Sequence, residues 1–140
     1  MQAIALTPQT CNTQKSLLDS MYRLRARVFR DRMGWDVEVR NGHETDEFDA
    51  IRPTYILAIS GRKQVAGCAR LLPAVGPTLL SVLFPELIGT KLFRPHRAMI
   101  ESSRFCVDTS IETARTGEGL HGATWTMFAG IIEWSMANGY

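Results

Sequence analysis

Residues 100–108 have the composition of a β-strand, but they carry an acid, two serines and an arginine where a strand normally has apolar side chains. Strand alternation places these side chains on two faces, with Glu101, Ser103 and Phe105 on one and Ser102, Arg104 and Cys106 on the other. A carboxylate or a guanidinium is costly to bury without a partner. We therefore expect complementary charges from another part of the chain to contact this strand.

The richest supply of such charges is the segment from Arg23 to Asp49. It begins within an amphipathic helix whose cap is expected at Thr10, Asn12 or Thr13 and whose apolar positions recur at spacings of four, three and four: Leu17, Met21, Leu24 and Val28. Five arginines lie between residues 23 and 32, and four acids follow within residues 44–49. Four like charges this close repel one another unless cations pair with them. We predict that this segment meets the strand 100–108 and that the site lies where they meet.

Composition places the chain among ordinary globular proteins. Its 140 residues form one domain, with 45% hydrophobic residues, 21% charged residues and a net charge of +2. Arginine outnumbers lysine 13 to 3, which favours pairing with carboxylates or phosphates. The three cysteines are widely spaced and form no CxxC motif, so we expect free thiols and a cytoplasmic location: Cys11, Cys68 and Cys106. No apolar run approaches the roughly 20 residues of a membrane span.

The remaining elements indicate a sheet covered by helices. Residues 4–6 suit an edge strand, residues 54–60 and 65–72 form a β-hairpin, and residues 79–88 suggest short helical turns. A turn is expected at Asn41-Gly42. A second long helix covers residues 120–138, with one stripe at Leu120, Ala123, Met127, Ile131 and Trp134. Because a further strand would follow Gly139, we expect the sheet to lack its C-terminal strands.

The sequence lacks the motifs of several familiar classes of enzyme and binding site. The sequence contains no phosphate-binding GxGxxG or GxxxxGK[ST] loop, no HExxH and no GxSxG. The three histidines, His43, His96 and His121, are not at metal-ligand spacings, so no metal site is predicted. Cys106 has no catalytic histidine signature around it and is expected to be a core thiol.

Four blocks of residues occur in a distinctive order: Leu24-Arg25-x-x-Val28-Phe29-x-x-Arg32-x-Gly34-Trp35, Asp46-Glu47-Phe48-Asp49, Gly67-Cys68-Ala69-Arg70-Leu71-Leu72-Pro73 and Glu101-Ser102-Ser103-Arg104-Phe105. This combination resembles the acyl-homoserine-lactone synthases, the autoinducer synthases of bacterial quorum sensing, and within them the TraI type of rhizobia and agrobacteria. The resemblance implies an α/β (α+β) fold similar to the N-acetyltransferases, a twisted mixed sheet flanked by helices, in a single domain over residues 1–140.

The resemblance also implies a reaction. Such enzymes join S-adenosylmethionine, as a substrate and without a further cofactor, to an acyl group carried on acyl carrier protein. By the same resemblance, the residues that bind S-adenosylmethionine are Arg25, Phe29, Trp35, Asp46, Asp49 and Arg70. The catalytic residues are Glu101, Ser103 and Arg104, with Glu101 as the base and backbone N–H groups near Ser103 to Phe105 as oxyanion donors if the strand bulges. The acyl chain is expected against Phe105 and Met127, with Phe84 a further candidate.

Alternatives stay open at this point. Asp49 and Arg70 suit a structural ion-pair network, and Phe84, Phe105 and Met127 suit a plain core equally well. The run Gly117-Glu118-Gly119-Leu120-His121-Gly122 is a faint version of the pyrophosphate loop of an acetyl-coenzyme-A-dependent acetyltransferase. The five arginines suggest a regulator or nucleic-acid binder, but the interleaved acids argue against nucleic acid. Lys91, Arg94 and Arg97 suit either docking of the acidic carrier protein or a solvated loop.

Overall fold

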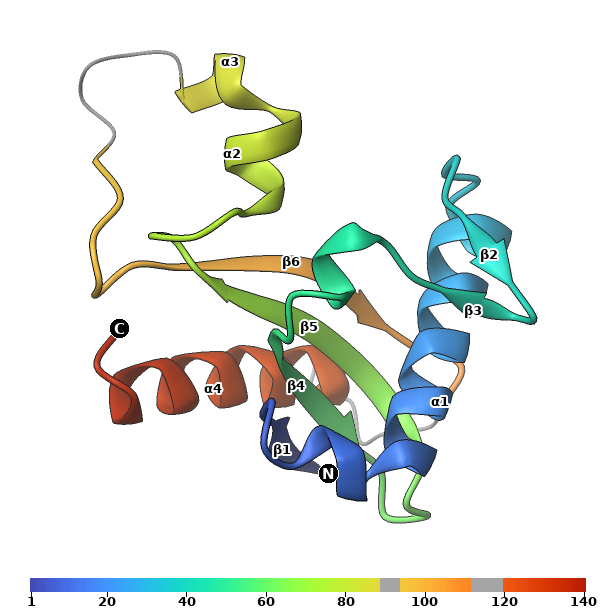
Figure 1. Cartoon of the computed structure of the whole chain (residues 1–140). Helices are drawn as coiled ribbons and strands as arrows, with labels where there is room; N and C mark the ends of the chain where they lie inside the picture. Colours follow the sequence, from blue (N-terminus) through green and yellow to red (C-terminus); the bar gives the residue numbers. More distant parts are fainter. Residues whose placement is uncertain (89–93, 112–119) are drawn as a thin grey trace.

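A four-stranded antiparallel sheet forms the centre of the computed structural model, which describes residues 1–88, 94–111 and 120–140. The strands run in the order β1 (Gln2–Leu6), β4 (Thr54–Ile59), β5 (Val65–Pro73) and β6 (Ile100–Val107). Each neighbouring pair is antiparallel, so the described strands include no parallel pairing of the kind a mixed sheet contains. The predicted hairpin and the predicted edge strand at the N-terminus are confirmed (Figure 1).

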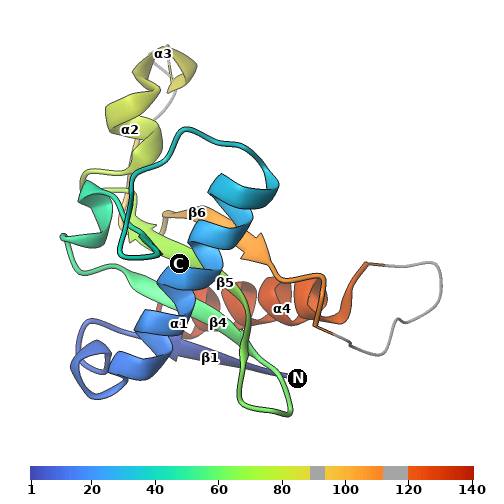
Figure 2. The same ribbon diagram turned by 90° about the vertical axis from the view of Figure 1, so that its right-hand side faces the viewer.

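Two helices cover opposite faces of this sheet, as Figures 1 and 2 show. Helix α1 (Lys15–Arg25) lies across β5 and β6, and it continues into a π-helical segment, η2 (Ala26–Arg32). Helix α4 (Gly122–Ala137) packs under all four strands. The smaller elements are η1 (Cys11–Thr13), β2 (Val39–Arg40), β3 (His43–Glu44), η3 (Glu47–Asp49), α2 (Leu79–Leu83) and α3 (Pro85–Ile88).

The apolar stripe predicted for the first helix packs as expected. Met21, Leu24 and Val28 are buried in one core, which includes Cys68 and Cys106. The predicted cap was wrong, because residues 11–13 form their own short helix and α1 begins after Gln14 without a side-chain cap. On the other face, α4 buries Ala123 and Met127, but Leu120 precedes the helix and is exposed.

The dipeptide Asn41-Gly42 forms the turn of the small hairpin β2–β3. Both residues have positive φ angles, 53° and 80°, the combination that a tight two-residue hairpin loop requires. The turn sends the chain back against α1 and leaves Glu44 completely buried at the end of β3. A turn that the sequence predicts thus delivers an acid to the interior.

Strand β6 contains a β-bulge. Cys68 faces Cys106 and Arg70 faces Ser103, so Arg104 and Phe105 together oppose the single residue Ala69. Arg104 has a φ of 52°. The extra residue breaks the simple alternation, so the predicted assignment of faces was wrong beyond Ser103. Arg104 joins Ser103 on the α1 side, while Phe105 packs on the α4 side.

The predicted α/β class with helices on both faces is confirmed, and β6 forms one edge of the described sheet. All three cysteines are free thiols, as predicted, and the sulfurs of Cys68 and Cys106 lie 3.4 Å apart in the core. Within the described ranges, no helix is both long and apolar enough to cross a membrane.

Candidate active site

Three arginines and three carboxylates form one network between α1 and the sheet. We call it the charged cluster, and its members are Arg25, Glu44, Asp46, Asp49, Arg70 and Arg104. The three positive and three negative formal charges cancel. These three acids of residues 44–49 and the arginines of β5 and β6 can therefore be buried together. The predicted meeting of the N-terminal segment with the strand 100–108 is therefore present in the structure.

Arg25 lies at the centre of the charged cluster and is completely buried. Its Nε donates to Glu44, and its two terminal nitrogens donate to the two oxygens of Asp49 at 2.8 and 2.9 Å. Burial lowers the pKa of Arg25, but the hydrogen bonds and charges of Asp49 and Glu44 outweigh burial and raise the pKa above its ordinary value. This guanidinium stays charged and fixed.

Asp49 accepts hydrogen bonds from three side chains. Besides Arg25, Arg70 donates to its Oδ1 at 3.2 Å and the Tyr55 hydroxyl donates to the same oxygen at 2.8 Å. Burial acts to raise the pKa of Asp49, but the Arg25 pair, the Asp46 amide and the Arg70 charge lower it below its ordinary value. The Tyr55 hydroxyl also lies 3.1 Å from that of Tyr22, which extends the network towards α1.

The sequence Asp46-Glu47-Phe48-Asp49 explains why both aspartates point the same way. The Asp46 side chain accepts from the Phe48 amide at 3.0 Å, and the Asp49 side chain accepts from the Asp46 amide at 2.9 Å, which is a capping box around η3. Arg70 then donates to Asp46, and its Nε donates to the Ser103 hydroxyl at 3.2 Å. Arg70 Nη2 is buried and has no hydrogen-bond partner among the residues that the structure describes.

Arg104 and Asp46 are the members of the charged cluster that lie nearest to solvent, with 16% and 18% of their side-chain surfaces exposed. The bulge directs Arg104 to Glu44, at 3.1 Å, and to Asp46, at 2.8 Å, the second contact being an ion pair without hydrogen-bond geometry. Its guanidinium carbon lies 5.8 Å from the centre of the Phe29 ring. The indole of Trp35 stacks on Phe29 with a centroid separation of 5.0 Å and an interplanar angle of 3°.

A groove of about 610 Å³ opens beside Arg104. It lies between the loop after η2, helix α2 and strand β6, and most of its surface is apolar: Trp35, Asp36, Val37, Leu79, Leu83, Phe84, Ser102, Ser103 and Arg104 line it. Trp35 keeps 46% of its surface exposed. An aromatic face, a guanidinium and a hydroxyl therefore converge on a space that could hold a small molecule with both charged and apolar parts.

Glu101 is held apart from the charged cluster. Its two carboxylate oxygens accept hydrogen bonds from the backbone amides of Leu79, at 3.1 Å, and Leu80, at 2.8 Å. These amides begin helix α2, so the carboxylate joins β6 to one wall of the groove. Glu101 and Ser103 lie on the same strand, and Ser103 lines the groove.

The structure separates the three residues predicted to contact the acyl chain. Phe84 lies in the groove at the end of α2. Phe105 stacks on Phe128 of α4 with a centroid separation of 5.2 Å. Met127 is completely buried beneath the sheet, where a Cβ added to Gly67 would lie 3.0 Å from its Cγ. Phe105 and Met127 thus belong to the α4 layer and Phe84 to the groove.

Glu44 is the site residue that the sequence prediction omitted. It belongs to the acid run, but residue type alone did not separate it from Glu47, which is exposed. Its signal was its position just after the Asn41-Gly42 turn, because that hairpin returns the chain to α1. The sequence prediction also omitted Tyr55, because a tyrosine in an apolar strand is ordinarily interpreted as a core residue.

The other arginines of the run have partners too. Arg23 pairs with Asp19, Arg27 with Asp108 and Arg30 with Asp31, at 2.9, 3.2 and 2.7 Å. Arg32 donates to the backbone carbonyl of Val107 at 3.1 Å, which ties η2 to the end of β6. All five arginines between residues 23 and 32 therefore form ion pairs or hydrogen bonds within this chain.

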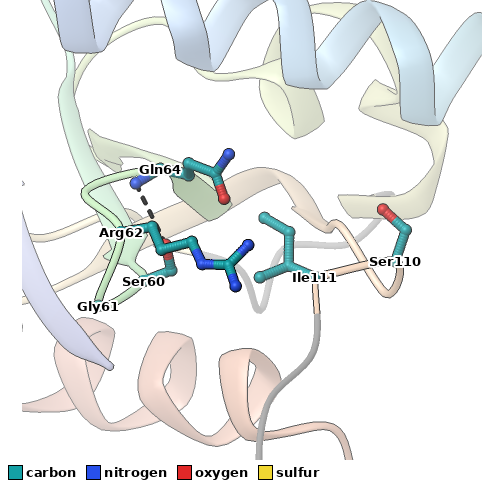
Figure 3. A pocket seen from close by; sticks show the side chains of 6 residues that line it. All are labelled: Ser60, Gly61, Arg62, Gln64, Ser110 and Ile111. Atoms are coloured by element: carbon teal, nitrogen blue, oxygen red, sulfur yellow. Dashed lines mark hydrogen bonds between the residues drawn. The ribbon is translucent and has the colours of Figure 1, made fainter.

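A second hollow, of about 550 Å³, lies at the turn between β4 and β5. Figure 3 shows its lining by Ser60, Gly61, Arg62, Gln64, Ser110 and Ile111, none of which belongs to the charged cluster. Gly117, Glu118 and Gly119 of the faint pyrophosphate loop lie outside the described residues, as does Lys91. No group of acids, histidines and cysteines in the described ranges could hold a metal ion.

Comparison with known proteins decides the family. Residues 9–140 match the family model described as autoinducer synthase. The chain belongs to the autoinducer synthase family. The resemblance on which the site residues were predicted is thereby confirmed at the level of the family.

Relatives of this chain come from the bacteria that the resemblance implied. The acyl-homoserine-lactone synthase of Rhizobium radiobacter is 54% identical over 140 residues, and that of Agrobacterium fabrum is 49% identical over the same length. Both alignments cover 100% of this chain and 66% of the relative, so the chain spans about two thirds of the length of these curated relatives.

Solved structures agree with the fold. The crystal structure of the synthase LasI superposes with a TM-score of 0.77 and 32% identity, covering 99% of this chain and 68% of LasI. The synthase BjaI, described as coenzyme-A-dependent and solved with S-adenosylmethionine and isopentyl-coenzyme A, has a TM-score of 0.83 at 24% identity. This superposition covers 99% of this chain and 62% of BjaI. At 24% identity, the similarity is evidence for the fold alone.

Proposed function

We propose that this chain acts as an acyl-homoserine-lactone synthase. It would join S-adenosylmethionine to an acyl group carried as a thioester on acyl carrier protein, releasing methylthioadenosine. The observation that carries the proposal is the 54% identity, over every residue of the chain, with the synthase of Rhizobium radiobacter. The geometry supports it in part: of the residues expected to bind S-adenosylmethionine, Trp35 lines the groove and Phe29 stacks on Trp35, whereas Arg25, Asp46, Asp49 and Arg70 belong to the charged cluster next to the groove residue Arg104.

The groove suits S-adenosylmethionine in charge and shape. This substrate carries an amine, a carboxylate and a sulfonium, and the groove offers the exposed face of Trp35 and the guanidinium of Arg104. A cation over an aromatic face is stabilised by the ring quadrupole, and a guanidinium pairs with a carboxylate. Arg25 and Arg70 act indirectly in this proposal, because they pair with Glu44 and Asp46, the two carboxylates that hold Arg104. Asp49 pairs with both of these arginines.

The first chemical step forms the amide. Glu101 takes a proton from the substrate amine, directly or through a water, and the nitrogen attacks the thioester carbonyl carbon. The carbon–sulfur bond of the thioester breaks and the proton passes to the departing thiolate. Backbone N–H groups at the bulge of Arg104 and Phe105 are the proposed donors to the oxyanion, because a bulge frees amides from the regular ladder.

The second step closes the ring. A carboxylate oxygen of the same substrate attacks the carbon bonded to sulfur, the carbon–oxygen bond forms, and methylthioadenosine leaves as a neutral thioether. No proton transfer is needed, so positioning is the contribution required of the protein. Arg104 and Ser103 line the groove where that carboxylate would lie.

The donor is proposed to be the carrier-protein thioester. Arg94 and Arg97 are exposed on the segment before β6, where an acidic carrier could dock. Coenzyme-A thioesters are the competing donors, because BjaI is described as coenzyme-A-dependent. The two donors present the same thioester and differ in the group that must dock.

Mass spectrometry tests the reaction. The chain is incubated with S-adenosylmethionine and either acyl carrier protein thioesters or the matching coenzyme-A thioesters, and the synthase of Rhizobium radiobacter serves as the positive control. We expect methylthioadenosine and an acyl-homoserine lactone in equal amounts with the carrier donor, and neither product with Glu101→Gln. Absence of both products, together with no S-adenosylmethionine binding by calorimetry, would refute the proposal.

A further inference from the structure

Glu101 makes contacts that a general base does not require. Both of its oxygens are occupied by the Leu79 and Leu80 amides, the first two N–H groups of α2. Thr78 completes the start of that helix in a capping box with Ser81, at 3.1 Å from the Ser81 amide to the Thr78 hydroxyl. The N-terminus of α2 is thus satisfied partly by its own cap and partly by a carboxylate from β6.

Helix α2 has little else to hold it against the sheet. Figure 1 shows α2 and α3 projecting from one end of the molecule, and Figure 2 shows the same projection after a quarter turn. Among the described residues, the hydrogen bonds that join α2 to the sheet are the two accepted by Glu101. Leu79 and Leu83 of this helix line the groove. The position of that wall therefore depends on Glu101.

We infer that Glu101 is a positioning residue for the α2 wall of the groove, in addition to its proposed part in proton transfer. The inference rests on the proposed function in so far as the groove binds S-adenosylmethionine. Ionised oxygens make strong hydrogen bonds to backbone amides, so the carboxylate holds α2 across from Trp35. Loss of this anchor loosens one side of the groove and weakens binding.

A backbone substitution separates the two roles of Glu101. Leu79→Pro removes the N–H that donates to Glu101 and leaves the carboxylate in place. Proline is favoured at the first helical position, and Thr78, with φ −125° and ψ 163°, already has the extended conformation that a residue before proline adopts. Leu79→Ala is the matched control, because it shortens the same side chain and keeps the amide.

Hydrogen exchange and calorimetry test the inference on the whole chain. We expect amides of residues 80–88 to exchange faster in Leu79→Pro than in Leu79→Ala. The dissociation constant of S-adenosylmethionine should rise about tenfold between the two variants, the effect of losing one hydrogen bond to a charged group. Glu101→Gln keeps one acceptor oxygen but loses the charge, so its amides at residues 80–88 should exchange at least as fast as those of Leu79→Pro, which keeps the Leu80 hydrogen bond to the carboxylate.

Equal exchange in the proline and alanine variants would overturn the anchor, and so would faster exchange with equal affinity. Failure of the unsubstituted chain to bind S-adenosylmethionine is a different result, because it would refute the proposed function. The exchange comparison needs no substrate, so the two failures are distinguishable.

Discussion

At the scale of single residues, burying the charged cluster carries a high desolvation cost, and each of its charges has a partner of opposite sign. Arg25, Arg70 and Glu44 have no exposed surface, and each would be expensive to bury alone. The cost is offset because every one of them faces a partner of opposite charge. Asp49 matters most, since Arg25, Arg70 and Tyr55 all donate to it. Removing it leaves two buried cations short of an acceptor.

Lowering the pH should reduce the stability that Asp49 contributes. Its pKa is lower in the folded chain than in the unfolded chain, so its contribution to stability is present above the ordinary carboxylate pKa of about 3.9. That contribution is lost as the pH falls through the folded pKa. Asp49→Asn should cost about 3–5 kcal/mol at pH 6, the usual effect of breaking a buried pair. In urea unfolding, the gap between the original chain and the variant should shrink from pH 6 to pH 3.

Asp19→Asn is the matched surface control. Asp19 pairs with Arg23 and His43, but its side chain is 47% exposed, so solvent screens the pair. We expect a much smaller loss at pH 6 than for Asp49→Asn. A gap for Asp49→Asn that stayed constant or widened towards pH 3 would show that the carboxylate charge is not the stabilising feature.

At the scale of elements, local patterns predicted most of the fold. The stripe of Met21, Leu24 and Val28, the hairpin of β4 and β5 and the Asn41-Gly42 turn all follow from periodicity and turn chemistry, which act over a few residues. The charge argument also placed the N-terminal acids and arginines against β6, because buried charges require partners.

Features that depend on tertiary context could not be predicted in this way. The bulge at Arg104 reverses the predicted faces of Arg104, Phe105 and Cys106 relative to Ser103, and no residue of the strand marks it, since Arg104 adopts its positive φ without being glycine or asparagine. The sequence identifies Glu101 only as an acid within a predicted strand. It does not predict that its partners are backbone amides of a helix more than twenty residues earlier. Glu44 becomes a site residue only because its hairpin folds onto α1.

Gly130 lies where α4 closely approaches Ala3 of β1. A Cβ built there would lie 2.7 Å from the Cβ of Ala3 and 3.0 Å from Cγ2 of Ile56. Alanine normally stabilises a helix interior by about 1 kcal/mol relative to glycine. We expect Gly130→Ala to lower the melting temperature instead, because Ala3 is held by strand pairing and cannot move aside.

A double substitution identifies the cause. Ala3→Gly removes the methyl group that Gly130→Ala would meet, so the pair should recover part of the lost stability in a thermal unfolding cycle. Independent, additive losses would mean that the two positions do not clash. Ala129→Gly, at an exposed position of α4, measures helix propensity alone.

At the scale of the whole molecule, the two faces of the sheet differ in what they expose. The α1 side carries the charged cluster and the groove, and its charges cancel within the chain. The α4 side carries an outer stripe of large apolar residues at helical spacing, with 55%, 44%, 58% and 72% of their surfaces exposed: Trp125, Phe128, Ile132 and Met136. Contiguous exposed apolar surface of this kind promotes association.

The stripe on α4 should therefore govern the solution behaviour of this chain. We expect the chain to bind a hydrophobic dye and to associate as its concentration rises in analytical ultracentrifugation. Ile132→Lys should reduce both, while the free energy of unfolding changes by only about 0.5 kcal/mol, as for other surface substitutions. Val75→Lys is the matched control, because Val75 is 58% exposed but lies outside the stripe, and the added charge is the same. Equal reductions from the two variants would assign the effect to net charge, and the stripe would then have no part in association.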